Sequence, residues 1–236
     1  MHNRLSIVIP CFNEPEAIPL VERRLGEFAN SLEFGRHFRE LELLVVDDGS
    51  DAETQTALES FTSARVIRNA QRLGYGGALK TGFQNATGDV IAFLDMDCSY
   101  DPMDLFLLLE KMQETKAKVA FGSRMVESNE MPALRWFGNY TYQKVMSSFF
   151  RCNLSDVCTG MRLFDRSLVP LALAINEMGL DFSIALTAQI VKTKTAYCET
   201  PITYSERAGR SKLNIMYDGF TFFRSIFRNR AAINLH

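Results

Sequence analysis

The sequence predicts an α/β fold in which helices flank a mostly parallel sheet. Short apolar runs alternate with stretches of helical periodicity through the first half of the chain, an order that is typical of parallel sheets. The runs are nearly continuous in apolar residues, as expected for strands that are buried on both faces. Acidic and polar residues directly follow several of the runs, at the strand ends where sheets of this kind bind ligands.

The predicted elements follow in order along the chain. Strands are expected at 5–10, 41–46, 64–68 and 89–94, and a fifth begins at 119–121. Helices are expected at 16–32, 52–61, 73–85 and 102–112, the last with a proline at its start. In the less regular second half, amphipathic helices are expected at 133–150, 180–192 and 215–230. No repeat or linker interrupts the chain, so we predict one domain over residues 1–236.

The composition is that of an ordinary globular protein, with 47% hydrophobic and 23% charged residues. A formal net charge of −2 argues against bulk nucleic-acid binding. The five cysteines form no CxxC pair or zinc-like spacing, which indicates a reduced, cytoplasmic compartment. No apolar run approaches the roughly 20 residues of a transmembrane span, so the chain is expected to be soluble or peripheral on a membrane.

Asp95 and Asp97 carry the strongest chemical signal, because they flank one residue at the end of a predicted buried strand. Alternation along a strand points both carboxylates to one side. Mg²⁺ and Mn²⁺ prefer such oxygens together with substrate phosphates. Ser99 or Asp101 suits the cap of the following helix, whereas the two aspartates come too early for that role. The pattern therefore predicts a divalent-cation site over a diphosphate.

Two earlier strand ends suggest contacts to a nucleotide. A carboxylate of Glu14 or Asp48 could accept hydrogen bonds from a base or ribose, and Phe12 could pack on the base, although both segments also suit plain turns. The glycines at 74–77 follow the third predicted strand instead of the first, so they do not fit a dinucleotide-binding fingerprint. Gly74 is instead expected to let the backbone approach a ligand or turn tightly.

Basic residues later in the chain are candidate phosphate ligands: Arg124, Arg207, Arg210 and Lys212. The segment 207–212 has the composition of a closing loop, and equally that of a solvated surface loop. Asp156 lies in a polar stretch and suits either a general base or a cap. The three histidines lie away from every candidate site, which argues against a histidine-based mechanism.

Taken together and in order, several segments resemble the inverting family 2 glycosyltransferases, in particular those that act on dolichyl and polyprenyl phosphates. The matching segments are 9–14, 45–50, 74–82, 95–102, 122–124, 159–164 and 209–214. The resemblance implies a GT-A fold, Rossmann-like in its sheet, with a C-terminal amphipathic helical elaboration. It also implies a nucleotide-sugar half over 1–125 and an acceptor half over 126–236.

The resemblance implies roles for individual residues. Donor contacts would come from Pro10, Phe12, Glu14, Asp48 and Gly74, and the metal ligands would be Asp95, Asp97 and Ser99. Phosphate or acceptor contacts would come from Arg124, Arg207, Ser211 and Lys212. The catalytic set would be Asp95, Asp97, Arg124 and Asp156.

The implied reaction moves a hexose from a GDP-mannose or UDP-glucose type of donor to a polyprenyl or dolichyl phosphate, with Mg²⁺ or Mn²⁺. One alternative is transfer to a hydroxyl of a glycan or soluble acceptor with Asp156 as base, and another is a non-catalytic nucleotide-sugar-binding or interaction protein. Near the C-terminus, Met216, Phe220, Phe223 and Phe227 recur at helical spacing. This stripe suits a membrane surface, a membrane-protein partner, or packing on the domain.

Overall fold

The protein is described from a computed structural model, which covers residues 2–126, 131–205, 207 and 215–231. Its centre is a seven-stranded sheet in the order β3-β2-β1-β4-β6-β5-β7. The strands are β1 (Arg4–Cys11), β2 (Glu40–Asp47), β3 (Arg65–Arg68), β4 (Val90–Phe93), β5 (Val119–Ser123), β6 (Arg162–Asp165) and β7 (Tyr197–Pro201).

Most of the strand pairs are parallel, which confirms the predicted class of sheet. β1 pairs in parallel with β2 and β4, β2 with β3, and β5 with β7. β6 runs antiparallel to both of its neighbours, β4 and β5. Neither β6 nor β7 was expected from the sequence. Because β6 comes from the second half of the chain and lies between two strands of the first half, the two predicted halves share one sheet.

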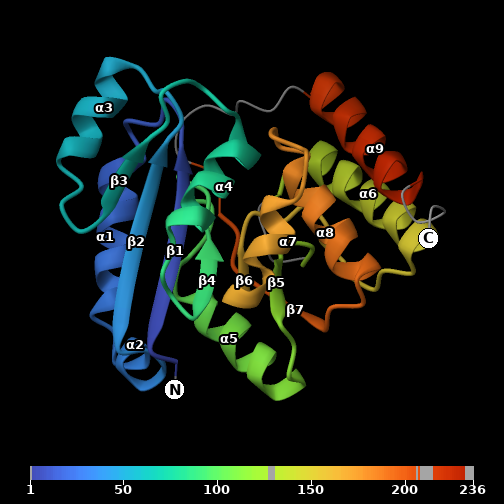
Figure 1. Cartoon of the computed structure of the whole chain (residues 1–236), viewed down its shortest axis with the longest axis horizontal. Coiled ribbons are helices and arrows are strands. Elements are labelled where there is room, and N and C mark those ends of the chain that lie inside the picture. The colour runs from blue at the N-terminus through green and yellow to red at the C-terminus, as the bar shows by residue number, and fades with distance from the viewer. Residues whose placement is uncertain (1, 127–130, 206, 208–214, 232–236) are drawn as a thin grey trace.

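Helices cover both faces of the sheet (Figure 1). The helices are α1 (Ile18–Ala29), α2 (Leu32–His37), α3 (Ala52–Glu59), α4 (Tyr75–Asn85), α5 (Asp104–Thr115), α6 (Ala133–Phe150), α7 (Val169–Leu173), α8 (Phe182–Lys192) and α9 (Ile215–Ala231), with a short 3₁₀ turn at Arg166–Leu168. Alternate strand residues feed two cores: Ile7 and Ile9 pack with α1, α2, α3 and α5, whereas Val8 packs with α4, α7, α8 and α9. Two-sided burial explains the continuous apolar runs.

The helix expected at 16–32 is α1, and a separate short helix that was not expected, α2, follows it at Leu32–His37. α1 ends near Asn30, and the hydroxyl of Ser31 then accepts a hydrogen bond from the Phe34 amide at 3.1 Å and caps α2. Among the described helices, none is both long enough and apolar enough to cross a membrane.

α6 and α9 lie side by side at one end of the molecule (Figure 1), where Tyr142 contacts Phe222 and Phe149 contacts Phe227 through their rings. The part of α9 that packs on the domain includes Phe222 and Ile226, at 7% and 1% exposed. The predicted stripe is divided between the two environments: Phe220 is 68% exposed and Phe227 is 53% exposed, whereas the ring of Phe223 packs against Tyr142. The side chain of Met216 lies outside the described residues.

Candidate active site

The predicted site segments meet at one edge of the sheet, because the carboxyl ends of its parallel strands point the same way. Cys11 at the end of β1 lies opposite Asp47 at the end of β2. Asp95 follows the end of β4, and Arg124 follows the end of β5. Since β6 is antiparallel, its first residue, Arg162, lies at this same edge opposite Phe93 and Phe121.

Asp95 and Asp97 are both held by side chains of their surroundings. The hydroxyl of Tyr75, the first residue of α4, donates to Asp95 Oδ1 at 2.8 Å. Ser99 donates to Asp97 Oδ1 through its amide at 3.0 Å and its hydroxyl at 2.5 Å. Burial and the neighbouring Asp97 raise the pKa of Asp95 to about 7, although the Tyr75 hydrogen bond opposes this rise. Two crowded carboxylates of this kind favour a cation between them.

The residues present fit a divalent cation that is shared with a substrate. Among the described residues, no cluster of three or more Asp, Glu, His or Cys side chains is arranged to hold a metal. Magnesium commonly takes one or two protein carboxylates and completes its shell with phosphates and water, so Asp95 and Asp97 suffice for such a site. Ser99 is 2% exposed and donates its hydroxyl to Asp97, which gives it a role in orienting that carboxylate. Its role as a metal ligand stays a prediction.

Arg207 connects two of the predicted donor residues. Its Nη2 donates to Glu14 Oε1 at 2.9 Å, and its Nη1 lies 3.6 Å from Asp97 Oδ2. This arginine is 193 positions from Glu14 along the chain, so the fold alone brings them together. Ser211 and Lys212 lie outside the described residues. The ring of Phe12 is covered by the guanidinium of Arg72 at 3.9 Å, a residue that the sequence analysis did not single out.

Asp48 is 3% exposed, and the chain itself occupies both of its oxygens. Its Oδ1 accepts from the Asn69 side chain and the Leu73 amide, each at 2.8 Å, and its Oδ2 accepts from the Gly74 amide at 2.7 Å. Asp48 therefore shapes the loop that leads into α4. Pro10 is buried within β1, opposite Val46. Direct contacts of either residue with a donor stay predictions.

The glycines at the start of α4 allow its backbone to approach the backbone of residues 178–179 closely. Gly74 has φ 90°, and a Cβ there would lie 2.5 Å from the carbonyl oxygen of Met178. The amides of Gly76 and Gly77 donate to the carbonyls of Gly179 and Met178, at 3.3 and 3.1 Å. Protein carbonyls thus accept hydrogen bonds from the amides at this helix N-terminus.

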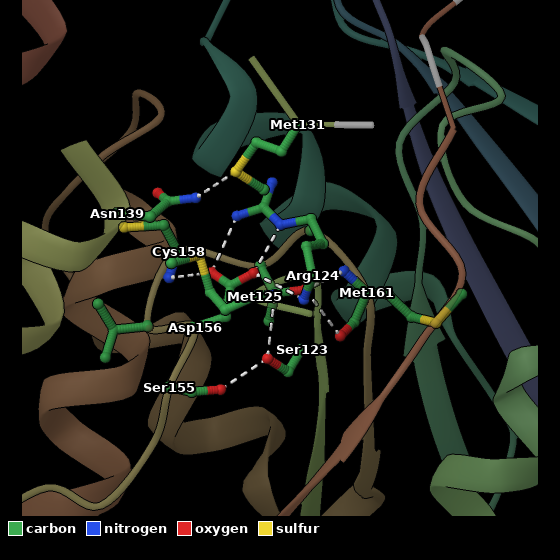
Figure 2. A network of polar contacts seen from close by, with 12 residues as sticks. Ser123, Arg124, Met125, Met131, Asn139, Ser155, Asp156, Cys158 and Met161 are labelled. Atoms are coloured by element: carbon green, nitrogen blue, oxygen red, sulfur yellow. Dashed lines mark hydrogen bonds and ion pairs between the residues drawn. The ribbon is translucent and has the colours of Figure 1, made fainter. Parts of the chain in front are cut away.

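Arg124 and Asp156 form a buried, bidentate ion pair (Figure 2). Arg124 donates to Asp156 through Nε at 2.6 Å and Nη2 at 2.9 Å, and its amide adds a 3.2 Å contact. Burial opposes the charge on Arg124, but Asp156 outweighs it and raises the pKa of the guanidinium well above its usual value. Glu199 accepts from the Asp156 amide at 2.9 Å and braces the loop from β7. Asp156 is 0% exposed, so it is built as a counter-ion for Arg124.

Besides Arg72, further residues around the site were not singled out by the sequence analysis, among them Tyr75, Tyr100 and Gly160. The Tyr100 hydroxyl accepts from the Gly160 amide at 2.8 Å. A Cβ on Gly160 would lie 2.3 Å from Asp95 Oδ2, so only glycine lets this loop pack against the carboxylate. Gly160 and Tyr100 lie within segments that resemble the family, and this resemblance was the sequence signal that could have identified them. Tyr75 stood in the glycine-rich turn, and its partner follows a strand 20 positions later.

The glycosyl transferase family 2 model matches residues 6–170 of the chain. An undecaprenyl-phosphate mannosyltransferase of Micrococcus luteus is 31% identical over 89% of this chain and 88% of its own length. The low-salt glycan biosynthesis hexosyltransferase Agl6 of Haloferax volcanii is 28% identical over 95% of this chain. The chain spans 53% of the length of that haloarchaeal relative.

A solved structure shares the fold. Glucosyl-3-phosphoglycerate synthase of Mycobacterium tuberculosis, in complex with Mn²⁺, UDP and phosphoglyceric acid, superimposes with a TM-score of 0.75. The match covers 97% of this chain and 78% of the synthase at 18% identity. A likeness at this identity concerns the fold, and this fold is of the GT-A class.

Proposed function

Because this chain belongs to glycosyl transferase family 2, we propose that it transfers a hexose from a nucleotide sugar to a polyprenyl phosphate at a membrane surface. One observation carries the proposal: Asp95 and Asp97 share a sheet edge with the buried Arg124–Asp156 pair. Carboxylates on one side suit a metal-bound diphosphate, and an arginine on the other suits an acceptor phosphate. The names of relatives that use undecaprenyl, polyprenol and dolichol phosphates support this acceptor class.

The donor side relies on the two aspartates. Asp95 and Asp97 would hold Mg²⁺ or Mn²⁺, which when bound neutralises charge on the departing diphosphate. Tyr75 keeps Asp95 oriented, and Ser99 does the same for Asp97. Arg207 lies close enough to Glu14 and Asp97 to add a second positive charge beside the diphosphate.

The acceptor side favours a phosphate over a hydroxyl. A phosphate monoester has its second ionisation near pKa ~6 and is already a nucleophile at neutral pH. One of its oxygens forms the bond to the anomeric carbon, the bond to the diphosphate oxygen breaks, and the nucleoside diphosphate leaves with both electrons. This single displacement inverts the anomeric carbon. A hydroxyl would need a base, and Asp156 instead accepts two hydrogen bonds from the Arg124 side chain.

A face built from α6 and α9 suits the membrane surface. Its exposed apolar residues are Leu134, Trp136, Phe137, Tyr140, Phe220 and Phe227. Every charged side chain that the structure describes on the two helices is basic: Arg135, Lys144, Arg224, Arg228 and Arg230. The sequence of the two helices adds one acidic residue, Asp218. Aromatic side chains among arginines and lysines are typical of a helix surface that lies on anionic lipid.

The donor part of the proposal is tested by calorimetry with UDP- and GDP-sugars in Mn²⁺, and again in EDTA. We expect one nucleotide class to bind in Mn²⁺, with the affinity lost in EDTA and in Asp97→Asn. If no nucleotide sugar binds under either condition, the chain is a non-catalytic member of the family and the proposal is wrong.

The acceptor part is tested by supplying radiolabelled donor with a panel of polyprenyl phosphates and saccharides. We expect label in the lipid products alone. Label that enters only the saccharides would establish the hydroxyl-acceptor alternative in place of the lipid phosphate.

A further inference from the structure

Arg162 is a fully buried cation at the sheet edge that carries the candidate active site. It opens β6, lies opposite Phe93 of β4 and Phe121 of β5, and has 0% of its surface exposed. It belongs to a segment that matched the family pattern, yet the proposed reaction gives it no role. Burying a guanidinium is costly unless its donors are satisfied, so its contacts indicate what it does.

The hydrogen bonds of the Arg162 guanidinium go to backbone carbonyls. Nε donates to the Thr159 carbonyl at 3.2 Å, and Nη2 donates to the carbonyls of Val157 at 3.3 Å and Ser183 at 2.8 Å. The guanidinium carbon lies 4.8 Å from the ring centre of Phe121. Within the described chain, no carboxylate forms an ion pair with Arg162, and Nη1 has no hydrogen-bond partner. The guanidinium therefore links the loop that contains Val157 and Thr159 to the start of α8.

The loop that Arg162 holds, residues 156–161, contacts both sides of the site. On the donor side, Gly160 packs so closely that a Cβ would lie 2.3 Å from Asp95 Oδ2. On the acceptor side, Asp156 pairs with Arg124. A shift of this loop would change the position of Asp95 and of the ion pair together.

We infer that Arg162 is a positioning residue, whose fork onto backbone carbonyls fixes the 156–161 loop against Asp95 and Arg124. The inference rests on the proposed function, because it assigns Arg162 to the geometry of the metal–diphosphate site. Lysine cannot replace the fork, since an ammonium is a point donor on a flexible stem.

The test compares Arg162→Lys with Arg166→Lys. Arg166 also donates to two backbone carbonyls, those of Ala86 at 2.8 Å and Gly88 at 3.4 Å, but it follows β6 at its far end from the site. Two readouts are made: calorimetric affinity for UDP or GDP with Mn²⁺, and amide hydrogen exchange of the protein without metal. The second needs no ligand, so it stands even if no nucleotide binds.

For Arg162→Lys we expect a folded protein whose Mn²⁺–nucleotide affinity falls by about 10- to 100-fold. We also expect amides of 157–161 to exchange at least ~10-fold faster, while those of β1 and β2 stay unchanged. Arg166→Lys should leave both readouts as in the unmodified protein. Gly160→Ala, which displaces the loop without altering Arg162, should reproduce the loss of affinity.

Three results would overturn the inference. One is Arg162→Lys with unmodified affinity and exchange, and another is an equal loss in Arg166→Lys. The third is an unfolded Arg162→Lys, which would make the arginine a residue of general stability. An unmodified protein that binds no nucleotide would instead refute the proposed function, and the exchange data would still decide the role of Arg162.

Discussion

Charged side chains of the candidate site contact other charged groups of the same chain. Asp95 is crowded by Asp97, Asp156 is paired with Arg124, and Arg207 reaches across to Glu14. Each contact raises or lowers the stability of the folded protein even when no substrate is bound. Stability measurements can therefore examine the site separately from activity.

Asp95→Asn should stabilise the metal-free protein at high pH. Burial and the neighbouring Asp97 raise the pKa of Asp95 from 3.8 to about 7 in the folded protein. The folded protein therefore binds a proton at this carboxyl more tightly than the unfolded chain does. Stability contributed by the protonated carboxyl is therefore present below pH 4 and lost as the pH rises through 7. Because one pKa unit corresponds to about 1.4 kcal/mol, we expect Asp95→Asn at pH 8 to gain up to about 4 kcal/mol in free energy of unfolding.

Urea unfolding in EDTA at pH 4.5 and pH 8 measures this difference. The stabilisation should be smaller at the lower pH, while donor binding in Mn²⁺ is lost at both. Equal stability of the two proteins at pH 8 would show that the Asp95 carboxylate is not strained in the metal-free site.

Asp156→Asn should destabilise the protein by about 3 kcal/mol, because it leaves Arg124 buried without its charged partner. The double variant Arg124→Met/Asp156→Leu removes both charges and should lose less than the sum of the single changes. A urea-unfolding cycle measures the coupling, and a loss below ~1 kcal/mol in Asp156→Asn would contradict the paired role. Lost transfer activity in Asp156→Asn alone consequently does not identify a general base.

At the scale of elements, α6 and α9 pack against each other and both carry exposed aromatic and basic side chains. We expect Trp136→Ser/Phe137→Ser to weaken binding to vesicles that contain phosphatidylglycerol by about 10-fold, since each change removes an exposed apolar group from the surface. Vesicle sedimentation measures this.

The matched control is Leu32→Ser, which removes an 84% exposed leucine from α2 and should leave vesicle binding unchanged. Salt should weaken the remaining binding, because the basic residues act through a screened field. Equal losses in the control and in the α6 variant, or vesicle binding that is insensitive to both, would contradict a lipid-facing α6.

Elements with a strong local pattern were predictable from the sequence, and those without one were not. β1, β2 and β4 contain nearly continuous apolar runs, so their burial on two faces is visible in the residues. β6 is four residues long and begins with a buried arginine, and β7 contains Glu199 and ends at Pro201. Both segments form strands because neighbouring strands pair with them, and this pairing cannot be predicted from the local sequence.

The candidate site divides in the same way. Asp95 and Asp97 stood out because their spacing and their position after a strand are local. The pairing of Asp156 with Arg124 is a contact across 32 positions, and that of Arg207 with Glu14 spans 193. Such contacts follow from topology alone.

For the whole molecule, a single sheet edge gathers residues from both predicted halves of the chain. β6 stands between β4 and β5, so the loop before it reaches the carboxylates that follow β4 and the arginine that follows β5. The predicted donor and acceptor sides are therefore two ends of one surface, with the α6–α9 pair at one end of the molecule (Figure 1).

The most direct test supplies radiolabelled nucleotide sugar with a matched pair of lipids, a short polyprenyl phosphate and the same polyprenol without its phosphate. Transfer is measured in Mn²⁺ and in EDTA as label in the organic extract. The account predicts label only with the phosphorylated lipid and only in Mn²⁺. Label that enters the unphosphorylated polyprenol as readily, or transfer undiminished by EDTA, would contradict it.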